Sequence, residues 1–135
     1  MQQLQFEAVW DRTISNKDRA YIERAFQETT LSATPSIQFS ALWHAINHKG
    51  ELLVTALVHN TGQTTFQFHQ QQLRYYLDKN TVATHTFTIT SMKIQGQTSM
   101  PWTFIFPIGS FDSNVNYMDD QFRMKEMQVV KAEMG

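Results

Sequence analysis

The chain has 135 residues, of which 41% are apolar and only 17% are charged, a composition and length that suit one globular domain. Eleven basic and twelve acidic side chains give a net charge of −1, and there is no cysteine, which excludes a nucleic-acid-binding surface, disulfides and thiolate metal sites. The absence of a membrane-spanning apolar run and of a signal-peptide pattern predicts a soluble, cytoplasmic protein.

The N-terminal part predicts one strand followed by one helix. Apolar and polar residues alternate from Leu4 to Ala8 and shift phase at Val9, which indicates a strand over residues 4–10 with a bend near its end. Ser15, three residues before Asp18, is typical of a helix N-cap. A helix is therefore expected over residues 16–29, with apolar residues at helical spacing: Ala20, Tyr21, Ile22, Ala25 and Phe26.

From residue 36 onward the pattern is typical of β structure. Strands are predicted over residues 37–47, 52–59, 65–69, 73–77, 82–88 and 102–106, separated by turn-forming residues. Both alternating sets of residues 52–59 are largely apolar, so this strand is expected to be central and covered on both faces. Residues 89–100 are predicted to be a loop centred on Gly96. Residues 121–130 fit either a terminal strand or a short helix.

Short strands with regularly spaced turns and a single early helix predict a mainly β fold. We expect an immunoglobulin-like antiparallel β-sandwich of seven or eight strands with one N-terminal α-helix. Only the architecture is predicted, because the cysteine pair of antibody domains is absent. The domain is expected to span residues 4–130, and residues 131–135 are expected to fray.

The polar residues do not form a recognisable catalytic or metal-binding pattern. His59, His69 and His85 lie in or near strands that could be neighbours, but no carboxylate has a matching spacing, so scattered strand-end histidines are favoured over a zinc site. Asp119 and Asp120 would point to opposite faces of a strand, and a solvated turn is the favoured interpretation. Nucleophile-elbow and nucleotide-binding motifs are absent. We therefore expect no enzyme activity, catalytic residue, metal or cofactor.

Aromatic residues, at 13% of the chain, are the remaining signal. Most are expected in the core, but Trp43, Tyr76 and Trp102 are candidate interaction residues. Because neighbouring strand residues face opposite sides, one of Tyr75 and Tyr76 must point outward, and Tyr76 beside a sheet edge is a candidate contact. The edge strands themselves could pair with a peptide or with a second copy in a homodimer.

Two segments resemble a known family. Residues 6–11 (FEAVWD), followed by Ser15 and the sequence Arg19-Ala20-Tyr21, form the first, and residues 98–107 (TSMPWTFIFP) form the second. This pairing resembles the SLAP domain of Firmicutes, which is found in accessory Sec system S-layer assembly proteins. The resemblance extends over about residues 4–107.

This resemblance implies a non-enzymatic accessory protein of the cytoplasm that acts beside the accessory SecA translocase in exporting or assembling surface-layer proteins. Its partner would be a component of accessory secretion or an exported surface protein, and nucleic acid is not expected. The residues leave two alternatives open: a sandwich that binds a glycan or small ligand through Trp43 or Tyr76, and a histidine-metal hydrolase.

Overall fold

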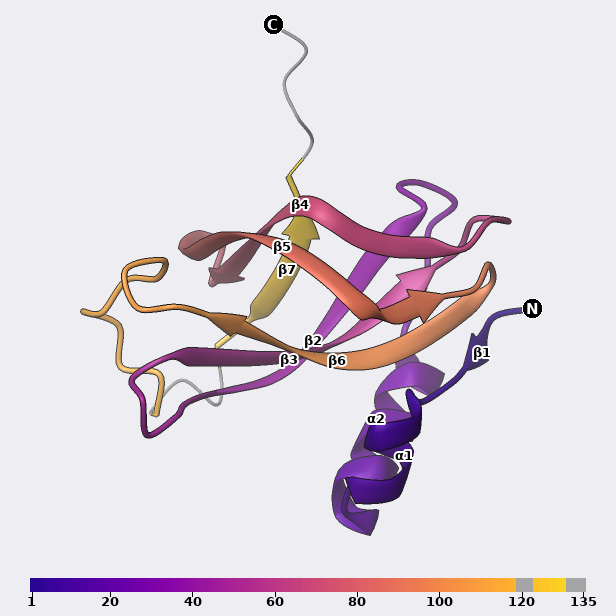
Figure 1. Cartoon of the computed structure of the whole chain (residues 1–135), viewed down its shortest axis with the longest axis horizontal. Helices are drawn as coiled ribbons and strands as arrows, with labels where there is room; N and C mark the ends of the chain where they lie inside the picture. Colours follow the sequence, from indigo (N-terminus) through magenta and orange to yellow (C-terminus); the bar gives the residue numbers. More distant parts are fainter. Residues whose placement is uncertain (119–122, 131–135) are drawn as a thin grey trace, which may run out of the picture.

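Two β-sheets pack face to face in the computed structural model, which describes residues 1–118 and 123–130 (Figure 1). One sheet has four strands in the order β1 (Gln3–Leu4), β6 (Thr98–Phe106), β3 (Leu52–Asn60) and β2 (Ile37–Ile46). The other has three strands in the order β5 (Asn80–Ile94), β4 (Phe66–Leu77) and β7 (Lys125–Val129). The predicted β-sandwich architecture is confirmed.

The main core lies between the two sheets and is rich in aromatic rings. Phe104 of β6 is 1% exposed, and its ring contacts Phe39 of β2, Phe68 of β4 and Phe87 of β5. Since these four rings come from both sheets, they join the two layers. Edge-to-face pairs of this kind contribute beyond the burial of their area.

The strand predicted to be central and covered on both faces is β3, and the prediction is confirmed. It lies between β6 and β2, and its residues are almost all buried. Val54, Ala56 and Val58 face the other sheet, whereas Leu57 points to the opposite face and packs with Ile22 of helix α2 (Asn16–Glu28). Helix α2 therefore forms a third layer on the outside of the four-stranded sheet (Figure 1).

Helix α2 begins where the sequence predicts and ends one residue earlier. The Ser15 hydroxyl accepts a hydrogen bond from the backbone N–H of Asp18 at 3.1 Å, which is the N-cap arrangement. At the other end, Thr29 is the C-cap residue, and its N–H donates to the carbonyl of Phe26. Local signals were thus sufficient to locate this helix.

Replacing Ser15 with alanine should lower the free energy of unfolding by about 1 kcal/mol, because the backbone N–H of Asp18 loses its partner. Replacement with aspartate, which can also accept this bond, should preserve stability. Urea denaturation of the three proteins measures the difference. Equal stability of the serine and alanine proteins would contradict the role of the cap.

The predicted first strand over residues 4–10 is wrong for most of its length. Only Gln3–Leu4 form a strand, and β1 runs parallel to β6. Residues Ala8–Thr13 form a short helix, α1, whose N-cap Glu7 accepts a hydrogen bond from the N–H of Val9. The described chain therefore has a second helix that alternation did not predict, since Phe6 and Trp10 pack under α2 and not in the sandwich.

Proline explains why β1 is so short. In this parallel ladder the N–H groups of Gln3 and Gln5 donate to the carbonyls of Gln97 and Ser99, both at 2.9 Å. The next bond would require an N–H at residue 101, and Pro101 has none. The chain accordingly leaves β6 and turns into α1.

Strand boundaries in the second half also differ from the prediction. The loop expected over residues 89–100 is wrong, because β5 extends to Ile94 and only residues 95–97 connect it to β6. The two strands expected over 65–77 are one strand, β4, which is interrupted by an irregularity where Gln70 has φ 49°. Of the two alternatives for residues 121–130, the strand is correct for β7, while residues 119–122 and the predicted frayed residues 131–135 lie outside the described chain.

Candidate protein-binding surfaces

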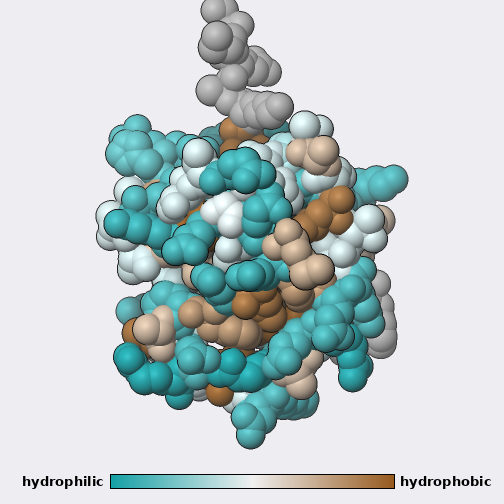
Figure 2. All heavy atoms as spheres, turned by 90° about the vertical axis from the view of Figure 1, so that its right-hand side faces the viewer, coloured by the Kyte–Doolittle hydropathy of each residue, from teal (hydrophilic) through white to brown (hydrophobic). Residues whose placement is uncertain are grey.

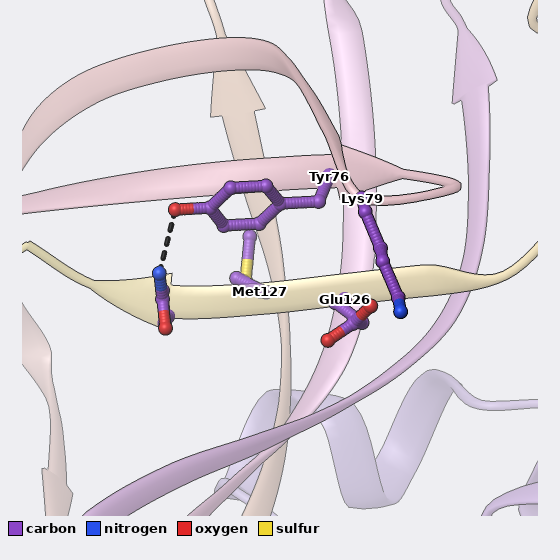
Figure 3. A pocket seen from close by; sticks show the side chains of 5 residues that line it. Tyr76, Lys79, Glu126 and Met127 are labelled. Carbon is purple, nitrogen blue, oxygen red and sulfur yellow. Dashed lines mark hydrogen bonds between the residues drawn. The ribbon is translucent and has the colours of Figure 1, made fainter.

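Tyr76 faces outward from the three-stranded sheet, whereas Tyr75 is fully buried, as the alternation predicts. The predicted position of Tyr76 beside a sheet edge is wrong, because β4 is the middle strand of its sheet. The Tyr76 hydroxyl accepts a hydrogen bond from Nε2 of Gln128 at 2.6 Å. Figure 3 shows the ring lying over the sheet, with Lys79 and Glu126 at the other end of a shallow hollow. The hollow is about 190 Å³, below the range of about 300–1,000 Å³ that is usual for small-ligand pockets. Its size gives little support to the binding of a small ligand through Tyr76.

Trp43 lies on the outer face of β2, where it contacts the helical layer. Its ring packs edge-on against Tyr21 of α2, with ring centroids 5.6 Å apart, and it joins the cluster formed by Ile22, Leu42 and Leu57. The pairing with Tyr21 was not predicted from the sequence. Figure 2 shows apolar atoms gathered in a hollow on one side of the molecule, and several side chains of this second cluster are only half-buried.

Trp102 lies on the inner side of β6 at the margin of the main core. It is paired in register with Ala56 of β3 and remains half-buried. It lines a groove of about 460 Å³ together with residues 103–105 of β6 and residues 85–91 of β5. None of these lining residues is an aspartate, glutamate, lysine or arginine. Among the three predicted interaction residues, Trp102 is the one that lines this groove.

The sequence did not predict a chain of hydrogen bonds that crosses the four-stranded sheet through His59. The Thr29 hydroxyl donates to the carbonyl of Ala25 at 2.7 Å and must therefore accept from Ser40 Oγ at 3.0 Å. Since the single hydroxyl hydrogen of Ser40 is then used, Ser40 Oγ accepts from Nε2 of His59 at 2.8 Å. These directions place the imidazole proton on Nε2.

The directions of the remaining hydrogen bonds, on the Nδ1 side of His59, follow from the same tautomer. With the proton on Nε2, Nδ1 of neutral His59 accepts from Ser99 Oγ at 2.6 Å. Ser99 Oγ in turn accepts from the side-chain amide of Gln2 at 3.0 Å. One continuous chain of hydrogen bonds thus runs from Thr29, at the end of α2, to Gln2, just before β1. Each donor in this chain has an acceptor.

Burial lowers the pKa of His59 to about 4, so the ring is neutral at pH 7. His59 and Ser99 are both fully buried, and neither side chain of this serine–histidine pair faces solvent. The pair is therefore a structural link between the neighbouring strands β3 and β6. One feature of the sequence could have indicated this link. His59 lies two residues after Leu57 and therefore faces the same side of a strand that is covered on both faces. A histidine buried there must be hydrogen-bonded.

The other histidines do not converge with His59. His44 uses Nε2 to donate to the carbonyl of Tyr117 at 2.9 Å, so its Nδ1 accepts from the hydroxyl of Tyr75 at 2.6 Å. His69 is exposed, and the ring of His85 packs on Phe87. Within residues 1–118 and 123–130, no group of three or more histidines or acidic residues is arranged to hold a metal ion.

These observations define the protein as a β-sandwich module with a helical outer layer, a buried polar link and an uncharged groove beside one sheet edge. None of the described helices is long and apolar enough to cross a bilayer. The family model of the SLAP domain matches residues 4–126, nearly the whole chain, and the chain belongs to this family. No curated protein and no solved structure gives a match.

Proposed function

We propose that this protein is a non-enzymatic, protein-binding module of the cytoplasm that supports accessory Sec-dependent export or assembly of surface-layer proteins. The observation that carries the proposal is the match of the SLAP domain model over residues 4–126. The partner is a component of the accessory secretion system or an exported surface protein.

Two features of the surface support a protein partner. The groove beside Trp102 has no Asp, Glu, Lys or Arg in its lining, and the centres of protein interfaces are depleted in such residues and enriched in aromatic ones. The net charge of −1 does not favour nucleic acid, whose binding requires clustered basic side chains. His59 and Ser99 are fully buried and hydrogen-bonded to each other and to Ser40 and Gln2, which supports a structural role for this pair.

Cross-linking in a Gram-positive bacterium that has an accessory Sec system tests this function. The tagged chain should capture the accessory SecA protein or a surface-layer precursor, whereas a tagged β-sandwich of another family should not. Loss of the protein should also reduce the amount of surface-layer protein exported. Recovery of neither partner, together with unchanged export, would contradict the proposal.

A further inference from the structure

The edge of β6 is paired along one half of its length and open along the other. Gln97 and Ser99 accept hydrogen bonds from β1 on this edge, while the opposite edge of β6 pairs with β3 from residue 98 to residue 106 without a register shift. Backbone groups alternate in direction along an unbroken strand. The N–H and C=O groups of Thr103 and Ile105 therefore point to the same edge as Ser99, beyond the last residue of β1.

These outward groups have no partner in the described part of the chain. Within the described residues, the backbone hydrogen bonds of β6 on this edge end at Ser99, and Pro101 blocks the continuation of β1. Natural sheets commonly protect such an edge with a lysine, a bulge or a covering segment. Residues 102–106 (WTFIF) contain no charged residue, and their pairing with β3 shows no bulge.

The neighbouring strand of the other sheet completes a site for an extended peptide. Strands β5 and β6 lie next to each other along one side of the sandwich (Figure 1), and residues 85–91 of β5 form the opposite wall of the groove beside Trp102. The first half of the β5 edge is covered, since Thr84 N–H donates to the carbonyl of Ser110 and Asp112 N–H donates to that of Val82. The groove lies beyond this covered part.

We propose that the open edge of β6 binds one extended segment of a partner polypeptide by strand addition, with Thr103 and Ile105 supplying the backbone hydrogen bonds. This inference rests on the proposed function and names the binding site for the partner. Side chains of an added strand alternate between the face of Trp102 and the face of Ile105. Because neither wall carries an Asp, Glu, Lys or Arg side chain, the segment is uncharged, with apolar or small hydroxyl side chains at alternating positions.

The chain itself contains the precedent for this mode of binding. Gln3–Leu4 form a short, uncharged, extended segment that already pairs with β6 through backbone bonds at Gln97 and Ser99. The proposed segment would pair with the same edge of β6, at Thr103 and Ile105, whose backbone groups point in the same direction as those of Gln97 and Ser99. This continuity favours a single short strand as the occupant over a second copy of the whole domain.

Proline at residue 105 tests the site, because it removes one outward N–H and places a ring on the open edge. Pro101 already occupies the same edge, and proline is tolerated where the N–H side faces solvent. The probe is a capped, fluorescent peptide of about six residues in which valine and threonine alternate, the length that the open part of β6 can pair. Ile105→Pro should weaken its binding by about tenfold or more, and clearly more than the matched Ile105→Thr, which alters the same side chain but keeps the N–H.

A second peptide keeps the test decisive if Ile105→Pro does not fold. Methylation of alternate backbone nitrogens removes the donors on one side of the peptide without changing its side chains, and it should abolish binding to the unaltered protein. Equal binding of the methylated and unmethylated peptides would overturn strand addition. So would a dimer of the unaltered protein, measured by sedimentation, that Ile105→Pro converts to a monomer, because a second copy would then occupy the edge.

Hydrogen exchange locates the binding site directly. In the free protein the amides of Thr103 and Ile105 should exchange much faster than those of Trp102 and Phe104, which face β3. The peptide should slow exchange at the first pair. If Ile105→Pro still captures the accessory SecA protein or a surface-layer precursor in cells as well as the unaltered chain does, the edge is not the binding site, although the proposed function stands.

Discussion

Replacing Phe104 with alanine is expected to lower the free energy of unfolding by about 3–5 kcal/mol. The ring is 1% exposed, and its centroid lies 5.4 Å from that of Phe68 and 5.4 Å from that of Phe87, both on the other sheet. Removing it takes away the apolar contacts that join the two layers and leaves a cavity that the rigid strands β3 and β6 cannot close. Guanidinium or urea denaturation followed by tryptophan fluorescence measures this change.

Two variants calibrate the result. Phe104→Leu preserves much of the buried volume and should cost clearly less than the alanine variant. Ile105→Thr changes the next residue of β6, whose side chain is 49% exposed on the opposite face, and should have a small effect. If Phe104→Ala were no more destabilising than Ile105→Thr, the aromatic cluster would not be the contact that joins the sheets.

The parts of the fold that depend on local sequence could be predicted. Helix α2 combines an N-cap at Ser15 with apolar residues at helical spacing, and both signals lie within a few residues of the element they define. The central position of β3 follows from two apolar faces on one short strand. The opposite orientations of Tyr75 and Tyr76 follow from strand geometry alone.

The parts of the fold that were predicted wrongly depend on residues far apart in the chain. The end of β1 is set by Pro101, which no pattern near Leu4 reveals. Residues 89–94 (ITSMKI) lose the regular alternation after Ile89 and lie just before Gly96, which favours a loop. They nevertheless belong to β5 and pair with β4 across an irregularity between Gln67 and Phe68. Strand pairing of this kind is a tertiary property that propensity does not determine.

The candidate interaction residues show the same division. The sequence identified Trp43, Tyr76 and Trp102 as large aromatic side chains, but it could not tell their environments apart. The structure packs Trp43 against Tyr21 and bonds Tyr76 to Gln128, while Trp102 lies beside the open half of β6. The edge that we propose as a binding site is defined by where β1 stops, and for that reason no single residue of β6 could have indicated it.

The stability of the protein is expected to fall on acidification because His59 is buried as a neutral ring. The pKa of His59 is about 4 in the folded protein, compared with 6.5 for an ordinary histidine. The unfolded chain therefore binds the proton first, so that the contribution of His59 is complete above pH 6.5 and is lost as the pH falls toward 4. Between pH 7 and pH 5 this one residue should lower the free energy of unfolding by about 2 kcal/mol.

The hydrogen bonds around the His59 ring also predict a loss of stability on acidification. A second proton on His59 would place an N–H at Nδ1 against Ser99 Oγ, which already accepts from Gln2, and would turn the Ser99 hydroxyl hydrogen away from its only recorded acceptor. Protonation thus leaves the Ser99 hydroxyl hydrogen without its acceptor and also charges a fully buried group. Urea denaturation at several pH values between 7 and 5 measures the loss, in a range where most carboxylates stay ionised.

His59→Gln removes the titrating group and should flatten this pH dependence, although it lowers stability at pH 7. His48→Gln, at an exposed turn, is the matched control and should preserve the slope of the unaltered protein. If His59→Gln proves too unstable, nitrogen NMR of the unaltered protein gives the same answer, because the ring should keep its proton on Nε2 and stay neutral at pH 5. A ring that becomes charged near pH 6.5, or a glutamine variant with an unchanged slope, would show that burial of His59 does not make folding sensitive to acid.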